Sequence, residues 1–297
     1  MSNGPAGHVA RSTVRPNSET TRRTPMRTFL YTDDGVTIDS VYDPGAVVYD
    51  ASRPPADDLV FVVAHGFTGD VDKPHVRRVA EAFTRQGAVV TFSFRGHGAS
   101  GGRSTVGDRE VLDLAAAVRW ARELGHARVV TVGFSMGGSV VLRHAAIYGE
   151  NGGTAPEGGA ERGAERGAHT DAVVSVSAPA RWYYRGTPHM RRLHWLVTRP
   201  EGRLVGRYGF RTRIHHREWD PVPMSPVEAV PRIAPTPLLI VHGDRDGYFP
   251  LDHPRMLARA AGDHGELWLE PGMGHAEHAA GDALLERIGH WAVSQGG

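Results

Sequence analysis

Ser135 is the residue of this chain best placed to act as a nucleophile. It lies at the centre of the segment 133–137, Gly-Phe-Ser-Met-Gly, after the β-branched run 129–132 and before a helix-like stretch that ends at Tyr148. A strand, a Gly-x-Ser-x-Gly turn and a helix form a nucleophile elbow, whose strained backbone exposes the serine hydroxyl. We expect the two glycines where side chains would clash, and the start of the helix should offer N–H groups to an oxyanion.

A carboxylate and a histidine follow predicted strands further along the chain. Asp246 comes shortly after the apolar run 237–241, and His275 comes shortly after the run 266–269. A serine nucleophile needs a base, and the base needs a group that orients it, so Ser, Asp and His in this order can form a triad. Open α/β sheets place their sites at the carboxyl ends of the strands, which is where these side chains are expected.

Both partners of the serine have competitors close by in the sequence. His278 lies three residues after His275, where the last helix should begin, and Asp244 lies two residues before Asp246. Asp244 can instead cap the turn that follows it. Three other histidines are interpreted as structural groups that brace loops by hydrogen bonds: His65, His97 and His242.

Alternating strands and helices must position these side chains. After a hairpin of 29–31 with 37–42, turning at 33–35, the pattern predicts strands 59–64, 88–94, 128–134, 172–177, 237–242 and 265–269, and helices 75–86, 108–124, 137–148, 253–261 and 279–294. This alternation predicts an α/β fold with a mostly parallel central sheet and helices on both faces. Right-handed crossovers would then place the carboxyl ends of the parallel strands at one edge.

The chain resembles the α/β-hydrolases over residues 28–294. The segment 65–69, His-Gly-Phe-Thr-Gly, is similar to the oxyanion loop of that family, and 94–100 is similar to its loop after the next strand. Together with the elbow around Ser135, these loops most resemble bacterial carboxylesterases of the feruloyl/cinnamoyl-esterase and monoacylglycerol-lipase type. The resemblance implies an α/β-hydrolase fold with a small cap insertion.

The resemblance also implies a role for each site residue. Ser135 would be the nucleophile, His275 the base, and Asp246 the acid, because it is the fifth residue of the family's His-Gly-x-x-Asp pattern. The N–H groups of Phe67 and Met136 would form the oxyanion hole. The implied activity is that of a serine hydrolase that cleaves carboxylic esters of small or medium acyl groups through an acyl-enzyme, with no metal and no cofactor.

A polar tail and two unusual segments flank or interrupt the predicted core. Residues 1–25 are rich in Ser, Thr, Arg and Pro and predict a disordered tail, and we hypothesise that translation could naturally start at Met26. The hydrolase domain is expected over 26–297. Within it, the low-complexity residues 149–170 predict a flexible insertion, and residues 180–230 predict a cap.

The predicted cap is rich in aromatic side chains and in arginine. We interpret its aromatic side chains as the lining of an acyl pocket, with Trp182 and Trp195 as substrate-binding residues. The arginines fit either of two interpretations, a surface that attracts an anionic substrate or a solvated basic face. The second needs no functional reason, because Lys73 is the only lysine of the chain and arginine is therefore its usual cation.

The composition of the chain excludes several kinds of chemistry and of binding partner. The 297-residue chain is 40% hydrophobic, has a formal net charge of +1 and contains no cysteine, so disulfides, thiol catalysis and thiolate metal sites are excluded and no pull toward nucleic acid is expected. It has no apolar run of about 18 residues or more, so no stable membrane insertion is expected. We expect a cytoplasmic enzyme acting on a small-molecule ester, and the sequence leaves the oligomeric state open.

Three other functions are compatible with parts of the sequence pattern. One is a thioesterase or acyltransferase whose arginines meet an anionic carrier substrate. A second is an aminopeptidase, which is disfavoured because the predicted cap has no acidic cluster to bind a free amine. The third is a non-catalytic ligand-binding member of the fold, in which a triad residue would usually be missing.

Overall fold

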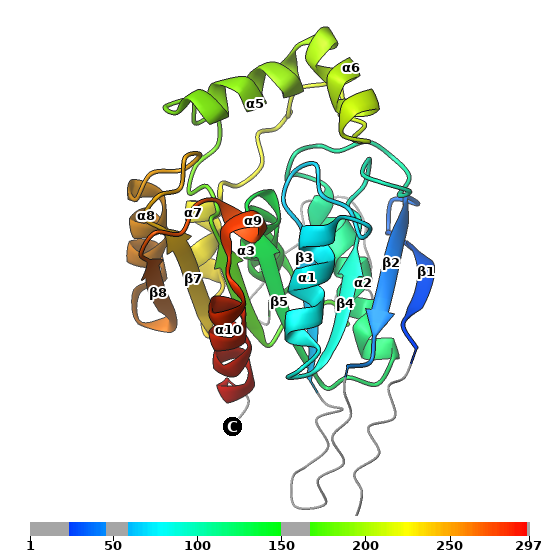
Figure 1. Ribbon diagram of the computed structural model, residues 1–297, viewed down its shortest axis with the longest axis vertical. Coiled ribbons are helices and arrows are strands. Elements are labelled where there is room, and N and C mark those ends of the chain that lie inside the picture. Colours follow the sequence, from blue (N-terminus) through cyan, green and yellow to red (C-terminus); the bar gives the residue numbers. More distant parts are fainter. Residues whose placement is uncertain (1–23, 46–58, 150–166, 296–297) are drawn as a thin grey trace, which may run out of the picture.

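The computed structural model describes residues 24–45, 59–149 and 167–295 of the chain (Figure 1). The tail predicted for 1–25 and the insertion predicted for 149–170 lie almost entirely outside the described residues.

A twisted sheet of eight strands runs through the described part of the chain in the order β1-β2-β4-β3-β5-β6-β7-β8. The strands are β1 (Met26–Tyr31), β2 (Thr37–Asp43), β3 (Leu59–Ala64), β4 (Ala88–Phe92), β5 (Arg128–Phe134), β6 (Ala172–Val176), β7 (Leu238–Gly243) and β8 (Gly265–Glu270). The hairpin β1–β2 joins β4 in antiparallel pairing, and the strands from β4 to β8 are parallel. The predicted α/β fold with a mostly parallel sheet is therefore confirmed.

Helices cover both faces of this sheet, because its central strands are apolar on both sides. Along β3, Val60 and Val62 pack into the core under α2 (Glu110–Glu123), α3 (Met136–Tyr148) and α8 (Asp252–Ala261). Phe61 and Val63 point to the opposite face and pack under α1 (Pro74–Phe83) and α10 (Asp282–Ser294). Figure 1 shows α1 and α10 in front of the sheet, with α2 and α3 behind it.

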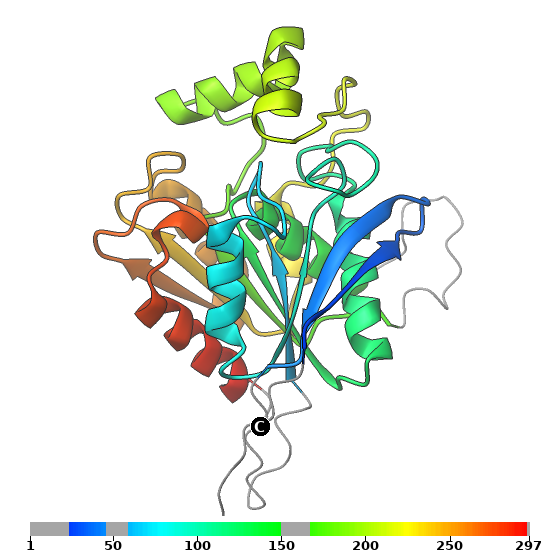
Figure 2. The same ribbon diagram turned by 45° about the vertical axis from the view of Figure 1, so that its right-hand side comes forward.

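A pair of helices stands beyond the carboxyl ends of the strands, within the segment 180–230 (Figures 1 and 2). They are α5 (Pro188–Thr198) and α6 (Pro200–Gly209), and each begins with a proline at its first position, where the missing N–H has no cost. Backbone bridges from Thr212 to His97 and from Ile214 to Ser104 join the segment to the loop after β4. The chain then returns through the short helices α7 (Pro226–Ala229) and η2 (Val230–Arg232) to β7.

The end of the chain differs from the helix predicted over 279–294. Two helices occupy this region, the short α9 (Ala276–Ala279) and then α10, separated by extended backbone at Ala280 and Gly281. The guanidinium of Arg78 on α1 donates hydrogen bonds to the carbonyls of Glu277 and Ala280, both at 2.8 Å. These contacts satisfy carbonyls that a continuous helix would have bonded internally, and they hold α9 against α1.

None of the helices in the described ranges combines the length and the apolar character that a membrane crossing requires.

His144 on α3 couples the stability of the core to pH. Its side chain is fully buried, and neither ring nitrogen has a hydrogen-bond partner among the described residues. Burial, together with the charges of Arg119 and His169, lowers the pKa of His144 from 6.5 to about 3. Because the folded pKa lies below the unfolded pKa, the unfolded chain takes up the proton first, and stability is lost as the pH falls from 6.5 toward 3.

Replacing His144 by phenylalanine should therefore flatten the pH dependence of stability. Between pH 7.5 and pH 5 the wild type should lose about 2 kcal/mol of unfolding free energy more than His144→Phe does. Urea unfolding at the two pH values measures this difference. His290→Phe, at an exposed position of α10, is the control and should keep the wild-type slope. An unchanged slope in His144→Phe would show that His144 does not resist protonation in the fold.

Candidate active site

The turn between β5 and α3 holds Ser135 in a strained conformation. Its φ is 52° and its ψ is −112°, and its N–H donates a hydrogen bond to the carbonyl of Val176 at 2.9 Å. A Cβ atom on Gly133 would collide with the carbonyl of Gly137, and one on Gly137 would collide with the carbonyl of Ala64. Only glycine fits at either position, which is what the sequence motif predicts.

His275 lies between Ser135 and Asp246. Its Nε2 is 2.8 Å from the Oγ of Ser135, and its Nδ1 is 2.8 Å from the Oδ2 of Asp246. The carboxylate can only accept a hydrogen bond, so Nδ1 carries the proton and donates it. Nε2 is then free to accept the hydrogen bond from the serine hydroxyl. The structure thus brings the three predicted residues into one continuous chain of hydrogen bonds.

The surroundings of Asp246 keep it ionised. Its Oδ1 accepts hydrogen bonds from the N–H groups of Tyr248 at 2.8 Å and Phe249 at 3.1 Å. Burial by itself raises the pKa of Asp246, but the hydrogen bond from His275 and the electrostatic influence of His275 and His242 outweigh burial and lower the pKa below its usual value of 3.8. At any pH above this lowered pKa the Asp246 carboxylate is charged, and it can hold the imidazole of His275 in one tautomer.

The two alternative residues, Asp244 and His278, make other contacts. Asp244 accepts a hydrogen bond from the N–H of Gly272 at 2.7 Å, which ties together the loops after β7 and β8. The ring of His278, on α9, lies against that of His75, with the centroids 3.9 Å apart and the ring planes tilted by 35°. Together with Glu277, these two histidines form a group of possible metal ligands that is separate from the cavity described below.

The three other histidines singled out in the sequence form hydrogen bonds to loops, that of His97 being to the carbonyl of Arg95 at 3.0 Å. The imidazole of His65 accepts a hydrogen bond from the N–H of Phe94 at 3.0 Å and donates one to the carbonyl of Gly66 at 2.7 Å. His242 donates to the carbonyl of Phe249 at 2.9 Å. These bonds fix the loops on either side of Ser135.

Two backbone N–H groups are available beside the serine. Phe67 lies in the loop after β3 and Met136 at the first turn of α3, and both line the same cavity as Ser135. Within the described part of the chain, neither N–H donates a hydrogen bond. The loop before Phe67 is held by a hydrogen bond from the N–H of Gly66 to the Glu277 carboxylate, 3.0 Å long. Free N–H groups at a helix start can bind a developing negative charge.

A cavity of about 480 Å³ opens above Ser135, between the sheet edge and the segment 180–230. Its aromatic lining includes four predicted cap residues: Trp182, Tyr183, Tyr184 and Trp219. Indole N–H groups fix two of these rings, since Trp182 donates to the carbonyl of Pro223 and Trp219 to that of Thr105.

Trp195 lies outside this cavity. Its side chain is 47% exposed and lies beside a shallow surface hollow with Arg191 and Arg192. The face of α5 that lines the cavity instead carries residues that the sequence analysis missed: Met190, Leu193 and Val197. Their spacing of three and four residues is the helical period that could have separated this face from the one that carries Trp195.

Four arginines and one acidic residue also line the cavity: Arg181, Arg185, Arg203, Arg217 and Glu218. Arg181 forms an ion pair with Asp252 at 2.8 Å, and Arg203 donates to the carbonyl of Thr198 at 2.9 Å. Arginine therefore makes up most of the charge at the cavity wall.

Comparisons with known proteins agree with this architecture. A model of the alpha/beta hydrolase family matches residues 59–287. A monoacylglycerol lipase from Mycolicibacterium smegmatis is 27% identical over 270 residues, which cover 84% of this chain and 93% of the lipase. The fold is similar to that of the esterase Pf2001 from Pyrococcus furiosus, with a TM-score of 0.65 and 21% identity over 91% of this chain and 92% of that one. Est1E from Butyrivibrio proteoclasticus, solved with ferulic acid, has a TM-score of 0.56 and 19% identity over 90% of this chain and 98% of that one.

The two aspartates after β7 should differ sharply in their effect on Ser135. Asp246→Asn puts an amide opposite Nδ1 and favours the wrong imidazole tautomer, so labelling of Ser135 by a fluorophosphonate should slow by about 100-fold or more. Asp244→Asn keeps an oxygen that can accept from Gly272 and should label at the wild-type rate. The measurement is the second-order labelling rate, with the modified peptide identified by mass spectrometry. Equal slowing in both variants would mean that the loop collapses when either aspartate is changed.

Proposed function

This chain belongs to the α/β-hydrolase family, and on that premise we propose that it is a serine carboxylesterase acting on small or medium acyl esters. The observation that carries the proposal is the chain of hydrogen bonds from Asp246 through His275 to Ser135, which lies at a cavity with aromatic walls. The lipase and esterase names of the similar proteins support the same class of reaction.

In the proposed acylation step, Ser135 attacks the ester carbonyl. The Nε2 of His275 takes the serine proton as the Oγ–carbon bond forms, and Asp246 stabilises the resulting imidazolium. The carbonyl oxygen becomes negatively charged and is held by the N–H groups of Phe67 and Met136. Losing one such donor typically raises the barrier by roughly 3 kcal/mol.

Collapse of the tetrahedral intermediate breaks the bond to the alcohol. His275 gives its proton to the departing alkoxide, so a neutral alcohol leaves and the acyl group stays on Ser135. Water then enters, His275 takes one of its protons, and the hydroxide adds to the acyl carbon. The second intermediate releases the carboxylic acid and returns the proton to the serine.

The cavity suits a compact acyl group. At about 480 Å³ it falls within the range of pockets that enclose small molecules. Apolar contacts come from aromatic rings and from the inner face of α5, among them Trp182, Trp219 and Leu193. These surfaces would bind an acyl chain or ring and leave the scissile carbonyl over Ser135.

The arginines at the cavity wall favour a second candidate, cleavage or transfer of an acyl group from an anionic carrier. Arg185 and Arg217 line the cavity, and Glu218 is the one acidic residue among the described residues that line it, so a phosphorylated leaving group would meet positive charge. An acyl-CoA and a nitrophenyl ester with the same acyl group separate the candidates: a higher kcat/KM for the thioester would favour the carrier.

Ser135→Ala should abolish ester hydrolysis and leave the fold intact, because the hydroxyl faces the cavity rather than the core. Only about 10³–10⁴-fold acceleration over water should remain, from the oxyanion hole and binding. Ser139→Ala is the matched control, since Ser139 lines the same cavity but donates its hydroxyl to the Met136 carbonyl at 2.7 Å. Turnover of nitrophenyl butyrate by the purified variants is the measurement. A folded Ser135→Ala enzyme with activity within tenfold of wild type would remove Ser135 from the mechanism.

Trp182 and Trp195 should differ in their effect on chain-length preference. Trp182→Ala removes part of the cavity wall, and losing about 60 Å² of apolar contact lowers kcat/KM for an octanoate ester roughly tenfold. An acetate ester is too short to make most of this contact and should lose much less. Trp195→Ala, outside the cavity, should change neither value. If Trp182→Ala lowers both esters equally, the indole supports the segment 180–230 rather than the substrate.

A further inference from the structure

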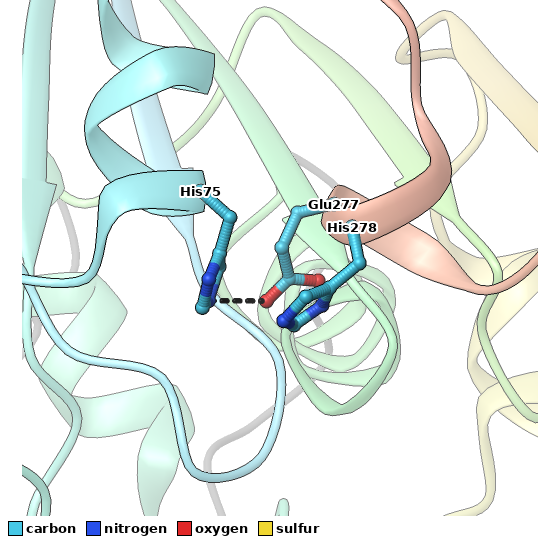
Figure 3. Close-up of side chains that lie close together, drawn as sticks. All are labelled: His75, Glu277 and His278. Atoms are coloured by element: carbon cyan, nitrogen blue, oxygen red, sulfur yellow. Dashed lines mark ion pairs between the residues drawn. The ribbon is translucent and has the colours of Figure 1, made fainter.

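We propose that His75, Glu277 and His278 form a binding site for a divalent transition metal ion such as Zn²⁺ (Figure 3). The site lies between the start of α1 and the short helix α9, and none of its residues lines the cavity over Ser135. It is independent of the proposed ester hydrolysis, since it rests only on the geometry of these three side chains.

The three side chains converge from two elements about 200 residues apart in the sequence. One ligand atom from each lies within 4.8 Å of the others, and the Nε2 of His75 is 3.9 Å from the Oε1 of Glu277. Figure 3 shows His75 reaching from α1 toward the two side chains of α9. Metal–ligand bonds of about 2.1 Å put the ligands of one Zn²⁺ roughly 3.4 Å apart, so binding would need small inward rotations of all three side chains.

Two buried groups in the cluster have bonding capacity left over. The Glu277 side chain is 4% exposed, and its one ionic contact within the described residues is the distant one with His75. The Nε2 of His75 is buried and has no hydrogen-bond partner in the same part of the chain. Within the described ranges, the Glu277 carboxylate has a hydrogen bond from Gly66 but no close cation, and the ring nitrogen of His75 has no partner, so one cation between them would satisfy both.

The surrounding structure orients the ligands in advance. The N–H of Gly66 donates to the Oε1 of Glu277 at 3.0 Å, which is the kind of outer hydrogen bond that positions a metal-binding carboxylate. Arg78 holds the backbone of α9 against α1 and also pairs with Asp282 at 2.8 Å.

The donor set selects the kind of ion. Two imidazoles and one carboxylate suit Zn²⁺, Co²⁺, Ni²⁺ or Cu²⁺, whereas Mg²⁺ and Ca²⁺ prefer a shell of oxygen atoms. Three protein ligands leave a fourth position for water. Because Oε1 of Glu277 accepts the N–H of Gly66, the residue before Phe67, an ion bound here would be linked through this carboxylate to the loop of the proposed oxyanion hole.

The test is a titration of the chelator-treated full-length protein with ZnCl₂ by isothermal calorimetry. Wild type should bind one Zn²⁺ per chain with a Kd of about 10 µM or tighter, and its Tm should rise with ZnCl₂ concentration. His278→Ala should weaken binding by tenfold or more, and His75→Gln should do the same. His278 is exposed, so this variant should keep the wild-type circular dichroism spectrum.

Two controls separate this cluster from other histidines. His290→Ala, and the pair His215→Ala with His216→Ala, should bind Zn²⁺ as tightly as wild type. Co²⁺ in place of Zn²⁺ should give the visible absorption of a four-coordinate site in wild type and lose it in His278→Ala. Equal Zn²⁺ affinity in wild type and His278→Ala, or no binding by wild type at 1 mM, would overturn the proposal.

Discussion

The backbone at Ser135 is the constraint on which the candidate site depends. A central strand passes directly into a helix, and the serine between them takes a left-handed φ of 52°. Such strain costs of order 1–3 kcal/mol and persists only where the surroundings enforce it. They do so here because the carbonyls of Ala64 and Gly137 press against two glycines, while Val176 accepts the serine N–H. The packed sheet supplies the free energy that holds this turn.

Parallel pairing brings the rest of the site to the serine. Asp246 follows β7 and His275 follows β8, and these strands are neighbours in register from Leu238 to Gly243. The two loops therefore start side by side, and their side chains meet at 2.8 Å although 29 residues separate them. Because β5, β6 and β7 are also consecutive in the sheet, Ser135 lies within reach of the same imidazole.

The sequence predicts most of this architecture because its signals are local. Apolar runs mark β3 and β5 to the residue, and the glycines at 133 and 137 mark the turn. Local signals fail where contact with a distant element decides the outcome. The break before α10 depends on Arg78 of α1, the direction of Trp195 depends on which face of α5 meets the cavity, and the approach of His75 to His278 depends on how α1 docks on α9. The composition of the predicted cap shows that it contains tryptophans, but it does not show which of them face the cavity.

The segment 180–230 leaves the sheet after β6 and returns to β7, and these two strands pair directly, with Val173 opposite Leu238. Its point of departure and its point of return are thus adjacent, whatever lies between them. Insertions, deletions or exchanges within the excursion leave the strand register unchanged, so they leave the distance from Ser135 to His275 unchanged too. Substrate range can then diverge between descendants of one ancestral gene while the reactive geometry is inherited intact.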